Sequence, residues 1–307
     1  MTIAPEIPTT KFISDVLNHM EAIPHWERRL FIKRRMPGQY PRFFYKYLAI
    51  DPEDSKSVIR ARDIVVRSQL WLANHERFND PFDLKANVVF EGNDLQKKKR
   101  LKALIANQSG APRKQRREIF EQMMKRPTGE WKAALTEIFR TRAKEIGVCS
   151  FANDPRSILM WSHYGKSHGG VCLQFEMALS PRAFTNAHPV EYSESYPEVN
   201  FIDGFEDSLI VPLLRKHKSW QYEGEWRLVH MTGASTSLPY DPSALRRIVM
   251  GAKASPAIYS CIHSLLRERR DAGLTNVELF RAEQHVTKYA LELRRLPVPE
   301  NESASKR

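Results

Sequence analysis

The chain has 307 residues, 42% apolar and 27% charged, which is the balance of a globular protein and excludes a disordered one. No apolar run reaches eighteen residues, so no transmembrane helix is expected, and the N-terminus lacks the pattern of a secretory signal. Three widely spaced cysteines, Cys149, Cys172 and Cys261, exclude a disulfide framework and a C-x-x-C metal site. We therefore expect a cytoplasmic protein without a membrane partner.

The net charge of +12 is concentrated in one part of the chain. Residues 95–147 contain 15 Lys and Arg against 5 Asp and Glu, so 15 − 5 = +10 lies there and the rest is close to neutral. A local basic patch indicates phosphate, nucleic acid or an acidic partner. A solvated helical face has the same charge pattern and needs no ligand.

The first half of the chain combines helices with two strands. Residues 1–40 are a predicted N-terminal helical segment that ends at the turn Pro37-Gly38. An aromatic-rich strand is predicted over 42–50, a short helix begins after residues 51–54, and an apolar strand is predicted over 64–74. The motif FNDPFD, Phe78 to Asp83, has the composition of a loop. Helical periodicity over 95–147 then predicts a basic helical insertion in at least two pieces.

The second half is dominated by strands. They are predicted over 147–153, 169–176, 190–193, 220–231, 245–253, 276–283 and 288–296, with helices over 157–165, 208–219 and 256–273. No regular alternation of strand and helix occurs, so we predict an α+β protein with a mixed or largely antiparallel sheet core. The predicted organisation is one α+β domain over 41–296, with the insertion at 95–147 and a flexible tail at 297–307.

The stretch WQYEGEWRL contains the best candidates for catalysis, Glu223 and Glu225. Read as a strand, it places these carboxylates about 6.6 Å apart on one face, together with Arg227. Such a pair could activate a nucleophile or stabilise an oxocarbenium-like centre. A solvent-facing polar stripe with a local ion pair explains the same alternation. Lys218, just before it, is a candidate phosphate ligand or a cation that neutralises the two glutamates.

The motif FNDPFD also allows two interpretations. Asn79 and Asp80 before Pro81 favour an Asx-type turn, with Phe78 and Phe82 as anchors in the core. Asp80 and Asp83 could instead bind a metal or a ribose hydroxyl. A metal is not expected, because a hard cation needs several converging oxygens. We predict a rigid turn beside a functional cleft.

Trp161 and Tyr164 lie three residues apart on the predicted helix over 157–165. This spacing usually means packing, but it could also offer a stacking surface for a base or a nicotinamide ring. His163 and His168 lack the spacing of a helical zinc pair. The sequence contains no P-loop, nucleophile-elbow or Rossmann motif.

The insertion carries two clusters of cations and few aromatic residues. Phosphate contact without base readout is the most that this composition supports. The candidate nucleic-acid-binding residues are Lys97, Lys98, Lys99, Arg100, Arg113, Lys114, Arg116 and Arg117.

Several motifs follow one another in a fixed order: Tyr45-Lys46-Tyr47, Phe78 to Asp83, Cys149-Ser150-Phe151, Met160 to Gly165, Gly169 to Cys172, and Lys218 with Trp220 to Arg227. This ordered set resembles the bacterial domain of unknown function 2971. The resemblance implies no established chemistry, only a setting of bacterial defence or mobile elements.

A second set of residues is similar to the ADP-ribosyltransferase superfamily. Its members carry a His or Arg on an early strand, a serine on a middle strand and a glutamate on a late strand, in the order of Tyr45-Lys46, Ser150 and Glu223/Glu225 here. This chain has Lys46 in place of the His or Arg. The resemblance implies a transferase with nicotinamide adenine dinucleotide (NAD) as substrate.

Two functions follow from these patterns. The first is an ADP-ribosyltransferase-like effector whose substrate contacts Tyr45, Lys46 and Asn79 beside the two glutamates. The second is a non-catalytic protein that holds nucleic acid or an acidic partner through the insertion. Convergence of Glu223, Glu225, Lys46, Asn79 and Trp161 on one pocket would favour the enzyme.

Overall fold

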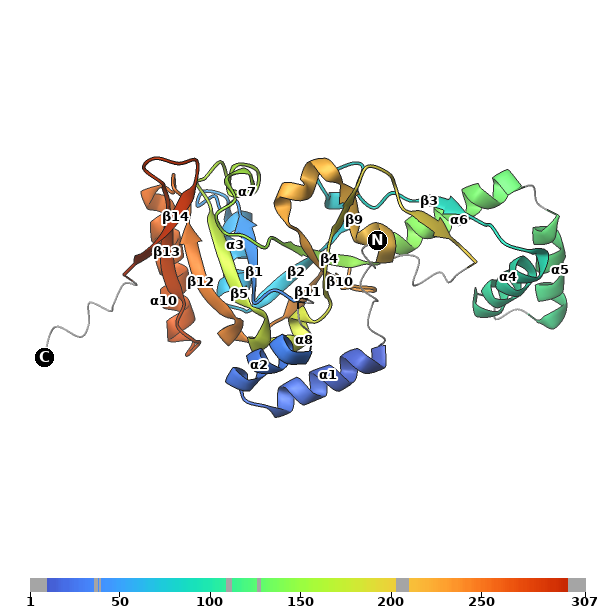
Figure 1. The fold of residues 1–307 in the computed structure, drawn as a ribbon, viewed down its shortest axis with the longest axis horizontal. Coiled ribbons are helices and arrows are strands. Elements are labelled where there is room, and N and C mark those ends of the chain that lie inside the picture. Colours follow the sequence, from blue (N-terminus) through green and yellow to red (C-terminus); the bar gives the residue numbers. More distant parts are fainter. Residues whose placement is uncertain are drawn as a thin grey trace, which may run out of the picture.

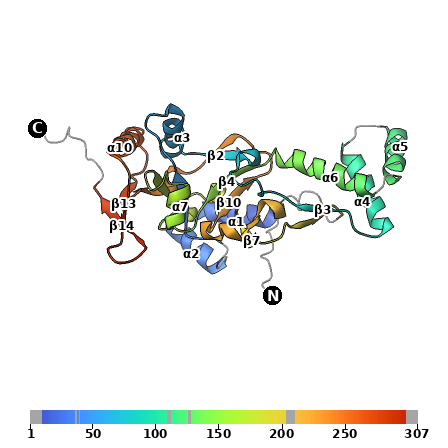
Figure 2. The ribbon, with the colours of Figure 1, turned by 90° about the horizontal axis from the view of Figure 1, so that it is seen from above.

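The computed structural model describes residues 10–35, 38, 40–108, 112–125, 128–202 and 210–297. Two five-stranded sheets form the body of the molecule, and a helical arm extends from it on the side opposite β14 (Figures 1 and 2). The α+β class and the mixed, mainly antiparallel sheets confirm the fold class predicted from the sequence.

The first sheet has the strand order β1-β5-β12-β13-β14. Its strands are β1 (Phe43–Leu48), β5 (Val171–Glu176), β12 (Leu245–Met250), β13 (Glu278–Gln284) and β14 (Leu291–Leu296). All pairs are antiparallel except β12 with β13. Helices α3 (Ser55–Val65) and α10 (Pro256–Asp271) pack against one face of this sheet, and α7 (Ile158–His163) packs against its other face. Because both faces are covered, all six residues of β5 are buried.

The second sheet has the order β11-β2-β4-β10-β6 and is antiparallel throughout. Its strands are β2 (Gln69–Asn74), β4 (Gly147–Phe151), β6 (Ala187–Pro189), β10 (Trp226–His230) and β11 (Thr236–Pro239). It touches the first sheet where Tyr45 and Ala152 exchange two backbone hydrogen bonds, of 2.9 and 2.7 Å. A cluster of buried aromatic rings packs beside this bridge, formed by Phe44, Phe151, Phe175 and Phe184.

Smaller elements complete the body. Two parallel strand pairs join β3 (Asn87–Val89) to β8 (Glu198–Asn200) and β7 (Glu191–Ser193) to β9 (Arg215–His217). Further helices of the body are α1 (Thr10–Ala22), α2 (His25–Arg35) and α8 (Pro181–Phe184). Short 3₁₀ turns are η1 (His75–Arg77), η2 (Met177–Leu179), η3 (Lys218–Glu223) and η4 (Pro242–Ala244).

The arm consists of α4 (Asp94–Gln108), α5 (Arg113–Met124) and α6 (Thr128–Ala143). It has an apolar cluster of its own, in which Leu101 and Leu135 are buried with Val88 and Phe201. These three helices occupy most of the range 95–147, where the sequence predicts helical pieces. Figures 1 and 2 both place α4 and α5 at the far end of the molecule.

Three predictions of local structure are correct over only part of their ranges. The strand predicted over 64–74 is the end of α3 followed by β2, because Ser68 turns the chain at φ 54°. Within the helix predicted over 208–219, residues 210–213 are helical, but β9 follows as a short strand that pairs with β7. The strand predicted over 220–231 begins only at Trp226, after η3 and a left-handed Gly224. The predicted tail lies outside the described residues from 298 onward.

Candidate functional site

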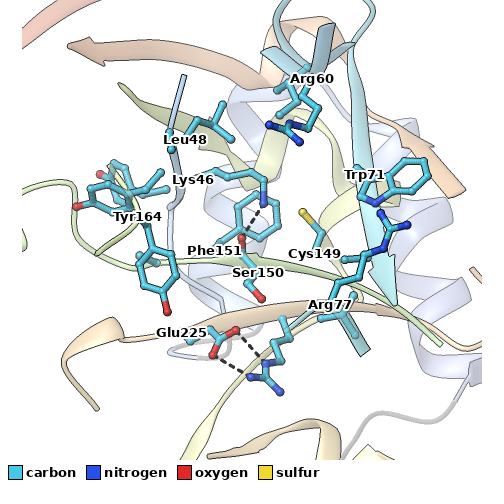
Figure 3. A pocket seen from close by; sticks show the side chains of 18 of the residues that line it. Lys46, Leu48, Arg60, Trp71, Arg77, Cys149, Ser150, Phe151, Tyr164 and Glu225 are labelled. Atoms are coloured by element: carbon cyan, nitrogen blue, oxygen red, sulfur yellow. Dashed lines mark hydrogen bonds and ion pairs between the residues drawn. The ribbon is translucent and has the colours of Figure 1, made fainter. Parts of the chain in front are cut away.

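A cavity of about 670 Å³ opens between the two sheets, beside the bridge between Tyr45 and Ala152. It is lined by residues of β1, α3, β2 and β4 and by the segments around Asn79, Tyr164 and Gly224. Figure 3 shows Tyr164 and Glu225 on one side, Arg60 and Trp71 on the opposite side, and Lys46 between them. We call this space the inter-sheet cavity.

The two candidate carboxylates reach the cavity through a turn and not through a strand. η3 ends at Glu223, and Gly224 then adopts φ 49°, a conformation that favours glycine. A Cβ at Gly224 would collide with the side chain of Asn153. The backbone N–H of Glu225 donates to the hydroxyl of Tyr192 at 2.9 Å, which fixes the exit of the turn. Both carboxylates consequently point toward the same cation.

That cation is Lys216, on β9. Its Nζ lies 2.6 Å from Glu223 Oε2 and 3.3 Å from Glu225 Oε2, and its side chain is only 4% exposed. Arg227 grips Glu225 from the other side, with Nε 2.9 Å from Oε1 and Nη2 3.1 Å from Oε2. The same guanidinium donates twice to Asp83, at 2.8 and 2.5 Å. Among the described residues, this buried network therefore joins three carboxylates to two cations.

The pKa values of the two glutamates shift in opposite directions, because neighbouring groups compensate the cost of burying each carboxylate to different extents. Burial opposes ionisation of Glu225, but Arg227, Lys216 and a hydrogen bond from Ser150 outweigh it and hold its pKa at about 2. Burial raises the pKa of Glu223, and Lys216 and Tyr164 reverse this only in part, with Glu225 adding to the rise. When all three carboxylates are ionised, the negative charge that Lys216 and Arg227 compensate least is therefore that of Glu223.

Tyr164 connects Glu223 to the FNDPFD turn. Its hydroxyl donates to Glu223 Oε1 at 2.5 Å and accepts from Asn79 Nδ2 at 3.1 Å. Burial and the neighbouring Glu223 raise the pKa of Tyr164, so the phenol stays protonated and remains a donor. This end of the cavity presents a carboxylate, a phenol and an amide in one hydrogen-bonded row.

The opposite side of the cavity is cationic and aromatic. Arg60 comes from α3 and Arg77 from the end of η1, and both side chains are exposed at the rim. Lys46 on β1 donates to the carbonyl of Ser150 at 3.2 Å. Trp71 is 44% exposed although its neighbours Leu70 and Leu72 are buried, because alternation along β2 turns it outward. This side can hold an anionic group beside a flat ring.

Seven of the residues predicted to act in catalysis or substrate binding line the inter-sheet cavity, and three do not. The seven are Tyr45, Lys46, Asn79, Tyr164, Glu223, Glu225 and Arg227. Asp80 is buried elsewhere, where it accepts the N–H of Phe82 at 2.9 Å and caps the turn. Trp161 is fully buried, and its indole N–H donates to the carbonyl of Pro155. Lys218 is exposed and pairs with Glu194 at 3.2 Å, so Lys216 contacts the glutamates in its place.

The FNDPFD motif is an Asx-type turn, as its sequence predicts. Only one of its predicted aromatic anchors is correct. Phe78 packs against a buried cluster and lies under the Arg227 guanidinium, 5.3 Å from ring centroid to Cζ. Phe82 is 61% exposed, because the turn directs it outward. Asp83 serves as a partner of Arg227.

Among the lining residues that offer a cation or an aromatic face, Arg60, Trp71, Arg77 and Lys216 were not among the candidates drawn from the sequence. Trp71 had a readable signal, since an aromatic residue between two leucines of a strand faces away from the core. Lys216 lies in the run RKHK, where nothing distinguishes it from Lys218 before the pairing of β9 is known. Arg60 and Arg77 lie on elements that only the tertiary fold brings to β1.

The predicted nucleic-acid-binding residues lie outside the cavity. Lys97, Lys98, Lys99 and Arg100 are on α4, in the arm. Arg113, Lys114, Arg116 and Arg117 are on the first half of α5.

Three further properties concern the described part of the chain: metal ligation, the cysteines and membrane-spanning helices. No three His, Cys, Asp or Glu side chains described there are arranged to hold a metal ion. Cys149 and Cys172 are buried, and burial raises the pKa of the Cys172 thiol well above its ordinary value. Within the described ranges, no helix is both long and apolar enough to cross a membrane.

A family model described as a protein of unknown function, DUF2971, matches residues 160–228. This segment covers most of α7 and all of β5, β9 and η3, and it contains Tyr164, Lys216, Glu223, Glu225 and Arg227. No curated protein and no solved structure gives a significant match. The comparisons support similarity to this family over the matched residues and do not extend it to ADP-ribosyltransferases.

Proposed function

We propose that the protein is a transferase that binds NAD, or a closely related dinucleotide, in the inter-sheet cavity and transfers its ADP-ribosyl group to an acceptor. The observation that carries this proposal is the convergence of Glu223, Glu225, Tyr164, Asn79 and Lys46 on one cavity, with carboxylates at one end and cations at the other. The cavity volume, about 670 Å³, lies within the usual range for small-molecule sites.

The excess negative charge at Glu223 suits the transition state of this reaction. NAD arrives with a positive nicotinamide ring, and cleavage of the C1′–N bond moves that positive charge onto the ribose as an oxocarbenium ion. The bonding electron pair leaves with nicotinamide, which becomes neutral. A network of three carboxylates and two cations, already in place and shielded from water, stabilises such a cation without reorganising.

The acceptor completes the transfer. Its nucleophilic atom forms the new bond to C1′ and gives up a proton, for which Glu223 is the available base because its pKa is raised. Tyr164 and Asn79 orient Glu223 through their hydrogen bonds. Glu225 is held by Lys216 and Arg227 and, with Ser150 beside it, supplies fixed negative charge.

The cationic side of the cavity suits the rest of the dinucleotide. Arg60, Arg77 and Lys46 provide positive charge for the pyrophosphate, and Lys46 acts there as a compact point charge in place of a His or Arg. The exposed face of Trp71 offers a stacking partner for adenine. An effector role in a defence or mobile-element setting, which the family resemblance implies, would use such an activity.

Labelled NAD incubated with the purified protein and a cell lysate tests the proposal. We expect label on macromolecules and release of nicotinamide, with a loss of about 100-fold or more in Glu223→Gln and Glu225→Gln, comparable to removal of one electrostatic group from an active site. Lys218→Gln is the matched control, because Lys218 is exposed and outside the cavity; it should retain activity. Absence of both label and nicotinamide release in the wild-type protein would refute the proposal.

A further inference from the structure

The arm exposes a cationic surface on which the described residues form few ion pairs, and we propose that this surface binds the phosphate backbone of a nucleic acid. The inference is independent of the transferase proposal, because the cations concerned lie on α4 and α5 and none of them lines the inter-sheet cavity.

The charge count of the two helices is unusual for this molecule. From 94 to 124 there are nine cations and three acidic residues, Asp94, Glu118 and Glu121, so 9 − 3 = +6. Among the described residues, one ion pair involves these cations, Arg117 with Glu121. The neighbouring α6 behaves differently, since Arg140 pairs with Glu137 and Arg142 with Glu145.

Three of the four lysines of α4 share one face of the helix. Lys98, Lys99 and Lys102 are spaced three and four residues apart, and all three are exposed. Arg113 and Lys114 are exposed at the start of α5, which packs against α4. Like charges held so close repel one another, and a polyanion relieves this repulsion and releases its own counterions on binding.

The chemistry of the arm favours nucleic acid over an acidic protein. Specific protein interfaces centre on clustered aromatic or large apolar anchors. Among the described residues of α4 and α5, the exposed large apolar side chains are Leu95 and Met124, one at the start of α4 and one at the end of α5. Two nearby rings, Phe90 and Phe120, are half-buried and have Lys97 and Lys102 over one face. We therefore expect contact with the backbone and no reading of base sequence.

Fluorescence anisotropy with labelled duplex and single-stranded oligonucleotides, without NAD, tests the inference between about 50 and 200 mM salt. We expect binding that weakens steeply with salt, and equally for unrelated sequences. The double variant Lys98→Gln/Lys99→Gln should reduce the slope of log K against log salt by about 1.4 to 1.8, at about 0.7 to 0.9 for each phosphate that the protein no longer neutralises. Glutamine preserves helix propensity at these exposed positions, which circular dichroism checks.

The matched control is Arg140→Gln/Arg142→Gln, which removes two cations that are already paired. For this control variant, the slope of log K against log salt should stay within about 0.5 of the wild-type value, because each paired cation contributes little free charge. Three results would overturn the inference: no binding at the lowest salt, equal slope changes in both double variants, or displacement of the oligonucleotide by polyglutamate at the same charge concentration. The last result would indicate an acidic protein as the partner. Glu223→Gln should bind like the wild type, which separates this inference from the proposed transferase.

Discussion

Glu223 and Glu225 are neighbours in one buried network, yet replacing each by Gln should have opposite consequences for stability. Glu225 is gripped by Lys216 and Arg227, and its pKa is about 2 against an ordinary 4.5. A difference of about 2.5 in pKa, at 1.36 kcal/mol each, corresponds to about 3 kcal/mol of native-state stabilisation at neutral pH. Glu225→Gln forfeits this and should lower the free energy of unfolding by about that amount.

Glu223→Gln should cost little or even stabilise the protein. The pKa of Glu223 is raised, so the native state disfavours its charge, and an uncharged amide of the same shape removes that penalty. The pH dependence follows from the same directions. The contribution of Glu223 to the free energy of unfolding is fully present below pH 4.5 and is lost as pH rises through its native pKa. Above that pH, Glu223→Gln should therefore become more stable relative to the wild type. The contribution of Glu225 is present above pH 4.5 and is lost as pH falls toward 2.

Urea denaturation of both variants from pH 4.5 to 8.5 measures these differences directly. If Glu223→Gln is destabilised as much as Glu225→Gln across this range, the assignment of the excess charge to Glu223 is refuted. If Glu223→Gln abolishes activity without lowering the free energy of unfolding, Glu223 is a residue that serves function at the expense of stability.

Three further variants test other parts of the structure. Lys216→Met should lose about 3 to 5 kcal/mol because it leaves buried carboxylates without their cation, whereas Lys218→Met, whose lysine is exposed, should lose less than about 1 kcal/mol in the same urea titration. Gly224→Ala and Gly273→Ala should each lose about 1 to 2 kcal/mol because both glycines have positive φ. Gly224→Ala should lose more than Gly273→Ala, because only at Gly224 does the new Cβ collide with a neighbouring side chain. Equal losses would contradict this. Trp71→Ala should weaken NAD binding about 5- to 150-fold in calorimetry, which corresponds to the about 1 to 3 kcal/mol typical of a stacked base, with unchanged stability. Trp26→Ala on α2 should leave binding intact.

Much of the fold could be predicted because its signals are local. The strands β1, β4, β5 and β12 are apolar runs bounded by turn residues, and α10 has helical periodicity closed by Gly273 at φ 70°. The stretch around Glu223 misled the prediction because a left-handed glycine, Gly224, interrupts a pattern of alternating residues. Alternation cannot reveal such a break, since the two sides of the turn still read as one strand.

The sequence indicated several residues of the candidate site, but not which residues form ion pairs with one another. The motif pattern pointed to Glu223, Glu225, Tyr164 and Asn79, and the structure brings these residues to one cavity. The choice between Lys216 and Lys218 depends on the pairing of β9 with β7, which is a long-range property. Trp161 was misplaced because a buried tryptophan and a stacking tryptophan have the same helical spacing.

The most direct test of the central claim is whether the purified protein breaks the bond between ribose and nicotinamide. Release of free nicotinamide from NAD, followed by chromatography for the wild type, Glu223→Gln and Lys218→Gln, measures that step without requiring the acceptor, because water can replace it. We expect steady release by the wild type and Lys218→Gln, and a loss of about 100-fold or more in Glu223→Gln with its fold intact. Equal release by all three proteins, or none by the wild type at saturating NAD, would contradict the assignment of the inter-sheet cavity as a dinucleotide-cleaving site.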